Sequence, residues 1–280
     1  MQVNLLNVFT SINEFGSMDI ASYSSKYLNR VNSVGEQLEY YVRDAIAGSL
    51  VAKEKEEIYS KVYSYLGNQN NPPDIIIKGG DAFEIKKIGG SSYTIALNSS
   101  PPKDRLYYND PRITDACREC EKGWKEKELF YVIGQVDEGK INQLLFVQGR
   151  CYAAAKKVYD NMHASLKASF EEVIKGKEFE IGDTVELGRV NRVDPLGITE
   201  LRVRGMWQMK NPIRFFEGQI DGKGEAYVGA IMLKDKFKAF AVSERKNLVR
   251  INGLVVKDIT VKDPNNTAKL LDAVIIKMVI

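Results

Sequence analysis

The sequence is poor in cysteine and histidine. Only three cysteines and one histidine occur among its 280 residues. An odd and small number of cysteines excludes a disulfide scaffold. The chain also begins without the basic stretch and the long apolar stretch of a secretory signal. We therefore expect a protein of the reducing cytoplasm.

The single histidine, His163, limits the catalytic classes that are open. A Ser/His/Asp or Cys/His nucleophile system would need this imidazole, and nothing near it in the sequence marks a partner, so we exclude that class. His163 borders an apolar run formed by Val158, Met162, Leu166 and Phe170. We expect it to pack at the edge of the core or to contact a phosphate.

Strong charge of one sign and long hydrophobic runs are also absent. Forty Lys and Arg against 37 Asp and Glu give a net charge of +3, so any contact with a polyanion would need local clusters. The apolar tail, residues 270–280, contains Asp272 and Lys277 and has eleven residues, whereas a membrane-spanning helix needs roughly 20. A hydrophobic content of 44% and a charged content of 28% predict a globular chain and exclude disorder, collagen and a membrane segment.

Hydrophobic periodicity predicts an α/β protein. Steps of three and four residues predict helices over residues 33–46, with Ser33 as N-cap, and over residues 54–66 and 152–174. A turn is expected at residues 68–73, because two prolines cannot continue a helix. Runs typical of strands occupy residues 74–78, 82–88 and 93–97, read as a three-stranded meander, and residues 129–136, 143–148, 185–193, 200–203, 226–233 and 239–242.

We interpret residues 1–280 as one compact chain. An α/β core spans about residues 29–175, and a strand-rich part spans about residues 176–280. The sequence contains no internal repeat, low-complexity tract or free linker that would separate the two parts.

The clearest chemical feature is Pro73-Asp74 on one predicted strand, followed by Glu84-Ile85-Lys86 on the next. Residues two apart on a strand point to the same face, so Glu84 and Lys86 project together while Ile85 turns into the core. Paired carboxylates are ligands for Mg²⁺, and the neighbouring Lys can hold a phosphate oxygen or help deprotonate a water. The alternative is a surface hairpin with solvated charges.

The loop between these strands decides whether a site exists. A two-residue loop, Gly79-Gly80, would pair Asp74 with Ile85 and turn Asp74 away from Glu84. A three-residue loop that includes Asp81 would pair Asp74 with Lys86 and place all three polar side chains on one face. We predict such an odd loop or an equivalent bulge.

Five segments in order resemble the PD-(D/E)xK nucleases, and more narrowly type II restriction endonucleases of the NgoPII type. They are residues 29–39 (NRVNSVGEQLE), 65–74 (YLGNQNNPPD), 81–88 (DAFEIKKI), 96–100 (ALNSS) and 116–120 (ACREC). The resemblance implies a restriction-endonuclease-like core with a mixed central sheet flanked by helices. It also implies a Mg²⁺-dependent homodimer that cuts both strands of a short palindrome in double-stranded DNA, GGCC in the NgoPII type. A cognate DNA methyltransferase would act on the same site.

The resemblance also implies roles for individual residues. Asp74 and Glu84 would bind the metal, the backbone carbonyl of Ile85 would add a ligand, and Lys86 would lie beside the nucleophilic water. Such nucleases often add a Glu from the preceding helix, for which Glu36 and Glu39 compete. At 100° per residue Glu39 lies closer to the apolar stripe, so we expect Glu39; the alternative is a solvated Glu at the edge of that stripe.

We expect residues 29–175 to be the catalytic core and the strand-rich part, about residues 176–280, to serve DNA recognition and packing. A basic stretch without acidic residues in that part, residues 201–216, is the candidate for DNA contact. Arginine reads guanine, and Asn or Gln can read adenine, in the major groove. The alternative is a strand with a solvated basic face. The DNA-binding candidates are Arg202, Arg204, Gln208, Lys210, Asn211 and Arg214, together with Asn98 and Ser99 from the fourth matching segment.

A zinc site is a weaker hypothesis. Cys117 and Cys120 have the spacing of half a site, and Cys151 and His163 would complete it. Eleven residues separate the second pair, which is poor spacing for a finger, so we favour free thiols. Two other functions remain open at this point: a structure-specific or repair nuclease with the same core, and a non-catalytic DNA-binding module.

Overall fold

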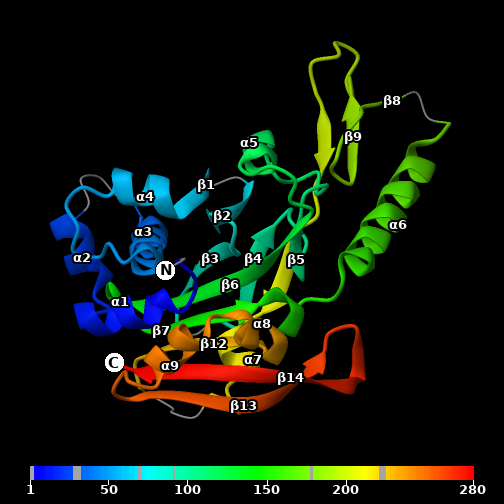
Figure 1. Cartoon of the computed structure of the whole chain (residues 1–280). Coiled ribbons are helices and arrows are strands. Elements are labelled where there is room, and N and C mark those ends of the chain that lie inside the picture. The colour runs from blue at the N-terminus through cyan, green and yellow to red at the C-terminus, as the bar shows by residue number, and fades with distance from the viewer. Residues whose placement is uncertain (1–2, 28–32, 69–70, 91, 177–178, 221–224) are drawn as a thin grey trace.

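The structure is a computed structural model that describes residues 3–27, 33–68, 71–90, 92–176, 179–220 and 225–280. It contains a large mixed sheet flanked by helices (Figure 1). The expected fold class, a mixed α/β architecture around a central sheet, is confirmed. Two expected features fall partly outside the described residues: residues 29–32 of the first matching segment, and Gln69 and Asn70 of the expected turn.

The central sheet has nine strands. Its path runs β1-β2-β3-β6-β7-β12-β14-β13, and β5 pairs with β6. Strands from the C-terminal half therefore extend the sheet that carries the catalytic candidates. The pairs β3 with β6 and β7 with β12 are parallel, and the others are antiparallel. The strands of this sheet are β1 (Tyr63–Asn68), β2 (Asn71–Ile77), β3 (Ala82–Ile88), β5 (Arg105–Tyr107), β6 (Glu126–Asp137), β7 (Lys140–Gln148), β12 (Tyr227–Leu233), β13 (Leu254–Asp263) and β14 (Asn266–Val279).

The two faces of the sheet are covered by different elements. The core on one face includes Leu38 of helix α3 and Phe130 of β6. The core on the other face includes Ile95, Met209 and Ile213 from elements that lie outside the central sheet. The helices are α1 (Asn7–Phe15), α2 (Ile20–Tyr27), α3 (Val34–Ala47), α4 (Glu56–Val62), α5 (Asp115–Glu119), α6 (Lys156–Ile174), α7 (Pro212–Phe215), α8 (Lys234–Ala239) and α9 (Val242–Leu248), with a 3-10 turn η1 (Gly149–Cys151). Within the described part of the chain, none of these helices has the length and apolar character needed to cross a membrane.

Local signals predict the first helix well and the second only in part. Helix α3 begins after Ser33, whose hydroxyl accepts a hydrogen bond from the Glu36 amide, as expected for an N-cap. The second helix, expected over residues 54–66, is wrong in its second half because the chain turns into β1 at Tyr63. In β1, Tyr63 packs in one core and Tyr65 in the other, because an irregularity in the register between them turns the two side chains to opposite faces.

The expected three-stranded meander is wrong in its third strand. Strand β4 (Thr94–Asn98) pairs with β11 (Trp207–Lys210) in a separate two-stranded sheet. The free edge of β3 is taken instead by β6, which pairs with it in parallel over the whole length of β3. Strand β6 is apolar on both faces and suits that central position.

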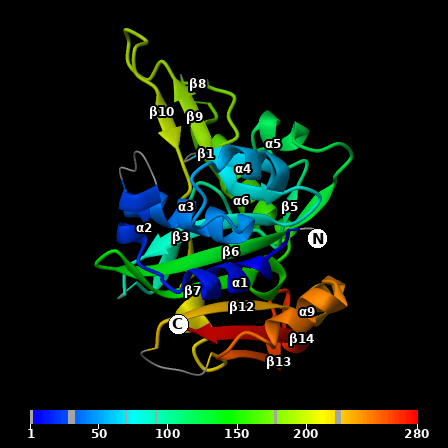
Figure 2. The same cartoon turned by 60° about the vertical axis from the view of Figure 1, so that its left-hand side comes forward.

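Two further expectations in the C-terminal part of the chain are corrected. Residues 239–242 do not form a strand, because they run from the last residue of α8 through a two-residue link to the first residue of α9. Glu244 accepts a hydrogen bond from the Ala241 amide at the start of α9. The apolar run on α6 does not pack on a core. Val158, Met162 and Leu166 are each about half exposed. Helix α6 and the small sheet of β8 (Glu180–Ile181), β9 (Gly188–Asn191) and β10 (Leu201–Val203) project from the body as an arm (Figures 1 and 2).

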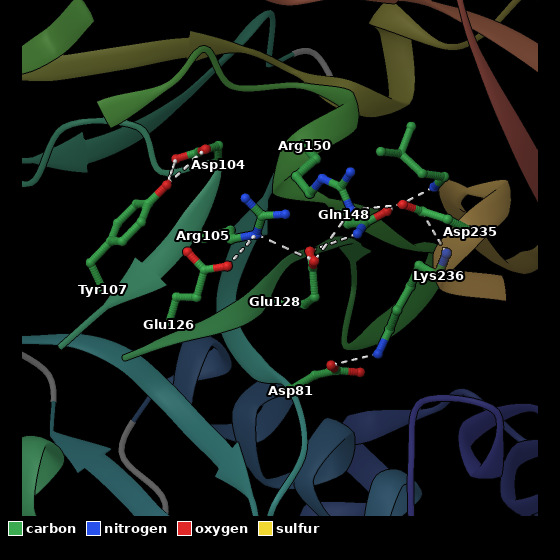
Figure 3. A network of polar contacts seen from close by, with 11 residues as sticks. Asp81, Asp104, Arg105, Tyr107, Glu126, Glu128, Gln148, Arg150, Asp235 and Lys236 are labelled. Carbon is green, nitrogen blue, oxygen red and sulfur yellow. Dashed lines mark hydrogen bonds and ion pairs between the residues drawn. The ribbon is translucent and has the colours of Figure 1, made fainter. Parts of the chain in front are cut away.

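A polar network ties the C-terminal part to the start of β3 (Figure 3). Lys236 of α8 lies 2.6 Å from Asp81, the residue before β3. Arg150 bridges Glu128 of β6, at 3.4 Å, and Asp235 of α8, at 3.2 Å. Because Lys236 holds the residue before β3, this network helps to fix the strand that carries Glu84 and Lys86.

Candidate active site

Asp74 and Glu84 lie on adjacent antiparallel strands, β2 and β3. The register pairs Ile76 with Ala82, and its continuation places Asp74 opposite Glu84. Asp74, Glu84 and Lys86 therefore share one face, as the odd loop requires. The expected pairing of Asp74 with Lys86 is wrong, because Asp74 lies opposite Glu84, two residues earlier. A shift of two residues leaves all three side chains on the same face.

The loop between the strands has three residues, Lys78, Gly79 and Gly80. The amide of Ile77 donates to the carbonyl of Asp81 at 3.0 Å, so Asp81 belongs to the ladder rather than to the loop. Gly79 has a φ of 62°, which a glycine adopts without strain. The expected odd loop is confirmed, and it begins one residue earlier than expected.

The three side chains form a tight polar cluster. Lys86 Nζ lies 2.6 Å from Glu84 Oε1, and the amide of Ile85 donates to Asp74 Oδ2 at 2.6 Å. The Glu84 side chain is 13% exposed. Its second oxygen, Oε2, is buried and has no hydrogen-bond partner among the described residues. A buried carboxylate oxygen without a donor is costly unless something else binds it.

The electrostatics of the cluster favour a further cation. Burial, and then the nearby charge of Glu84, raise the pKa of Asp74 well above its ordinary value. Burial lowers the pKa of Lys86, but Glu84 and Asp74 outweigh it, so the pKa of Lys86 is raised. Lys86 is thus an ammonium at neutral pH. Two carboxylates share this one ammonium.

The structure places Glu39, rather than Glu36, beside the cluster. Burial raises the pKa of Glu39, and the charges of Lys86 and Glu84 also act on it. Glu36 instead caps α3 together with Ser33. Helix α3 is held close to β6, because a Cβ on Gly134 would lie 2.6 Å from Leu38. Leu38 precedes Glu39, so this close approach positions the carboxylate.

A cavity of about 240 Å³ opens over the cluster. Asp74, Glu84 and Lys86 line it together with Asn98 and Ser99 at the end of β4. Five residues from three separate stretches of sequence therefore meet at one surface. The remaining wall comes from the arm, from the segment after β5 and from further residues of β2, β4 and β11.

Several residues of that wall were missed or weakly marked by the sequence. Arg112 and Trp207 line the cavity, as do Glu186, Arg204 and His163. His163 lines the cavity rather than the edge of a core, since α6 has no buried residue, and the expected phosphate contact stays a prediction. Burial, then the charges of Arg112 and Lys167, lower its pKa. Arg112 and Glu186 had no motif to mark them, since only the tertiary fold brings them to the β2–β3 pair.

The DNA-binding candidates divide by position. Arg204 lies on the cavity, and Arg202 is close to it, since both guanidinium groups bind the Glu186 carboxylate, at 2.8 and 2.6 Å. Gln208 and Lys210 are exposed on β11, beside β4.

The last two candidates are engaged elsewhere. Asn211 is buried, donates to the Ser92 carbonyl and accepts from the Ile213 amide. Arg214 stacks on Tyr93 at 4.2 Å and borders a different cavity.

The donor set fits Mg²⁺ better than zinc. Within the residues that the structure describes, no three His, Cys, Asp or Glu side chains are arranged as a ready metal cage. Mg²⁺ does not need one, since it is commonly held by one or two carboxylates and keeps several waters. Cys117, Cys120 and Cys151 are free thiols, and burial raises the pKa of Cys117 to about 12. A thiol with so high a pKa is a poor ligand.

Comparisons with known proteins identify the family of the chain. The family model for the NgoPII restriction endonuclease matches residues 3–263. The chain is 38% identical to the type II restriction enzyme NgoPII of Neisseria gonorrhoeae over 98% of this chain and 99% of that protein. No solved structure shows significant similarity. The resemblance expected from five short segments is confirmed over nearly the whole length.

Proposed function

The chain belongs to the NgoPII restriction endonuclease family and is a site-specific endonuclease, and from this premise we propose the details of its reaction. It hydrolyses phosphodiester bonds in both strands of a short palindrome in double-stranded DNA, with Mg²⁺ as cofactor and as a homodimer. GGCC is the expected site, by similarity to the NgoPII type. A twofold dimer supplies two equivalent active sites for two equivalent strands.

The observation that carries the proposal is the unpartnered, buried Oε2 of Glu84 beside the high-pKa carboxyl of Asp74. The two carboxylates and the backbone carbonyl of Ile85 would hold the cation. When bound, Mg²⁺ stabilises the developing charge and lowers the pKa of a bound water.

Lys86 is the residue that contacts the reacting groups from the protein side. Its raised pKa keeps it charged, so it acts as a hydrogen-bond donor to the water or a phosphate oxygen rather than as a base. Glu39, whose carboxylate lies 3.0 Å from Arg43 Nη2 and interacts electrostatically with Lys86, would help to orient that ammonium. Arg112, Arg204, Asn98 and Ser99 line the path along which the phosphate backbone would approach.

The test separates cleavage from binding. Asp74→Ala, Glu84→Ala and Lys86→Ala should each lower the cleavage rate at least about a hundredfold, as does the loss of a preorganised transition-state contact. All three should still shift DNA in Ca²⁺, because the basic surface that holds the phosphates remains. Near wild-type cleavage by any one variant would remove that residue from the site.

Matched controls come from the exposed pair Glu57 and Lys61 on α4, whose side chains are 77% and 71% exposed. Glu57→Ala and Lys61→Ala should cleave like the wild type. Plasmid DNA with Mg²⁺ reports the class: discrete bands support site-specific cutting, a smear indicates a structure-dependent nuclease, and a shift without cutting indicates a binding module. Sequencing the product ends tests GGCC, and sedimentation with and without DNA tests the dimer.

A further inference from the structure

Glu186 occupies an unusual place at the rim of the cavity. It lies in the segment between β8 and β9 and lines the same cavity as Asp74 and Lys86. It is an acidic side chain on a wall whose other charged arm residue, Arg204, is basic. A carboxylate beside the expected path of a polyanion opposes binding unless it has another purpose.

The contacts of Glu186 show that purpose. Its Oε1 lies 2.6 Å from Arg202 Nη2 and 2.8 Å from Arg204 Nε, and its Oε2 accepts from Arg202 Nε at 3.1 Å. One carboxylate therefore engages two guanidinium groups. The geometry is the one that a DNA phosphate would use with the same arginines.

The fold holds the carboxylate in place while the arginines stay accessible. The Leu187 amide donates to the Val203 carbonyl at 3.1 Å, so the segment of Glu186 is fixed against the strand that carries Arg202. The Glu186 side chain is only 11% exposed, whereas those of Arg202 and Arg204 are 56% and 55% exposed. An incoming phosphate can reach the arginines from solvent, but it has to compete with a carboxylate that is already there.

We propose that Glu186 is a positioning and specificity-determining residue that occupies the phosphate-binding fork of Arg202 and Arg204 until cognate DNA displaces it. Non-cognate DNA offers mainly phosphate contacts, and each of these can form only when an ion pair between Glu186 and an arginine breaks. Cognate DNA adds base contacts that favour the exchange. Glu186 thus lowers non-specific affinity more than specific affinity. The inference rests on the proposed function, since it assumes a DNA backbone in this cavity.

Binding assays in Ca²⁺ test the proposal on the full-length protein. Glu186→Gln keeps the size of the side chain and removes its charge, so we expect tighter binding, on the order of tenfold at low salt, to a duplex that lacks the cleavage site. The plot of log K against log salt should steepen by about 0.9 for each additional phosphate contact, and so by up to about 1.8. Affinity for a duplex with the mapped cleavage site should change less.

A matched control and a double variant make the outcome specific. Glu200 forms an ion pair with Arg189 on the same arm and is not among the residues that line the cavity, so Glu200→Gln should leave the salt slope unchanged. In a protein with Arg202→Gln and Arg204→Gln, adding Glu186→Gln should change neither the DNA affinity nor the salt slope any further.

Three results would overturn the proposal. They are an unchanged salt slope for Glu186→Gln, an equal shift for Glu200→Gln, or weaker binding of Glu186→Gln to the cleavage-site duplex, which would make Glu186 a base reader. Failure of the nuclease assignment itself is seen separately, as a wild-type protein that shifts plasmid DNA but does not cut it in Mg²⁺.

Discussion

Asp74→Asn should stabilise the metal-free protein while it abolishes cleavage. Asp74 and Glu84 share a single ammonium, and burial together with Glu84 raises the pKa of Asp74 well above its ordinary value. Asparagine removes one charge and keeps an oxygen that can accept from the Ile85 amide, which now donates to Asp74 Oδ2 at 2.6 Å. The substitution therefore relieves the repulsion and retains the hydrogen bond.

The pH dependence fixes the sign of the effect. Because the folded pKa of Asp74 is raised above 3.8, the unfolded chain ionises first, and the free energy of unfolding falls as pH rises from that value to the folded pKa. Each pKa unit is worth about 1.4 kcal/mol. At pH 8 without metal, Asp74→Asn should thus unfold at a higher temperature than the wild type, and each 1 kcal/mol gained would raise Tm by roughly 2 °C. The gain should shrink near pH 4.

Mg²⁺ should reverse the order of the two proteins. A ligand that binds only the folded state at ten times its Kd adds about 1.4 kcal/mol. We expect this gain for the wild type and little gain for Asp74→Asn, so calorimetry in EDTA and in Mg²⁺ gives opposite rankings. Glu57→Gln, on the exposed face of α4, serves as control. If Asp74→Asn were less stable than the wild type in EDTA at pH 8, Asp74 would be a stabilising ion-pair partner and the electrostatic reasoning would fail.

Three further predictions concern the same region. Glu39→Gln should slow cleavage without weakening DNA binding. Glu36→Ala should leave the cleavage rate unchanged and lower stability by up to about 1 kcal/mol, because alanine cannot accept the hydrogen bond from the Ser33 amide; rate assays and thermal unfolding distinguish the two variants. The Mg²⁺ concentration for half-maximal cleavage should fall as pH rises, since Asp74 must lose its proton to bind the cation. A half-maximal Mg²⁺ concentration that does not change with pH would contradict this. Atomic absorption should find less than one zinc per chain, because Cys117 and Cys151 are buried in a hydrophobic core; a stoichiometric metal would refute it.

The sequence was most informative where one stretch of chain determines the outcome. The cap at Ser33, the odd loop before β3 and the shared face of Glu84 and Lys86 all depend on neighbours within a few residues. The odd loop could be predicted because only an odd number of loop residues brings Asp74 to the same face as Glu84. The residue at which the loop begins could not be predicted, because the hydrogen bond between the Ile77 amide and the Asp81 carbonyl determines it.

The errors arise where distant segments compete for the same edge or face. β4 has the composition of a third meander strand, and nothing within it shows that β6 would take the edge of β3. The sequence around Tyr63 has the pattern of a continuing helix, and only the pairing of Tyr63 with Ile77 shows that the helix has ended. Arg112 and Glu186 reach the cavity only through the path of the chain around β6 and the arm.

The apolar stripe of α6 shows the limit of periodicity most clearly. Val158, Met162 and Leu166 recur at intervals of four residues, and this spacing is typical of a face that packs on a core. In the structure each of them is about half exposed, and helix α6 has no buried residue. Its contacts lie on the neighbouring side, where Tyr159 packs on Trp207 and His163 faces the cavity. At 100° per residue, Met162 and His163 point to clearly different sides of the helix. Periodicity therefore establishes that one side of a helix is apolar, while the side that touches the protein, and hence the residue that reaches the active site, is set by the β9 and β11 strands that come later in the chain.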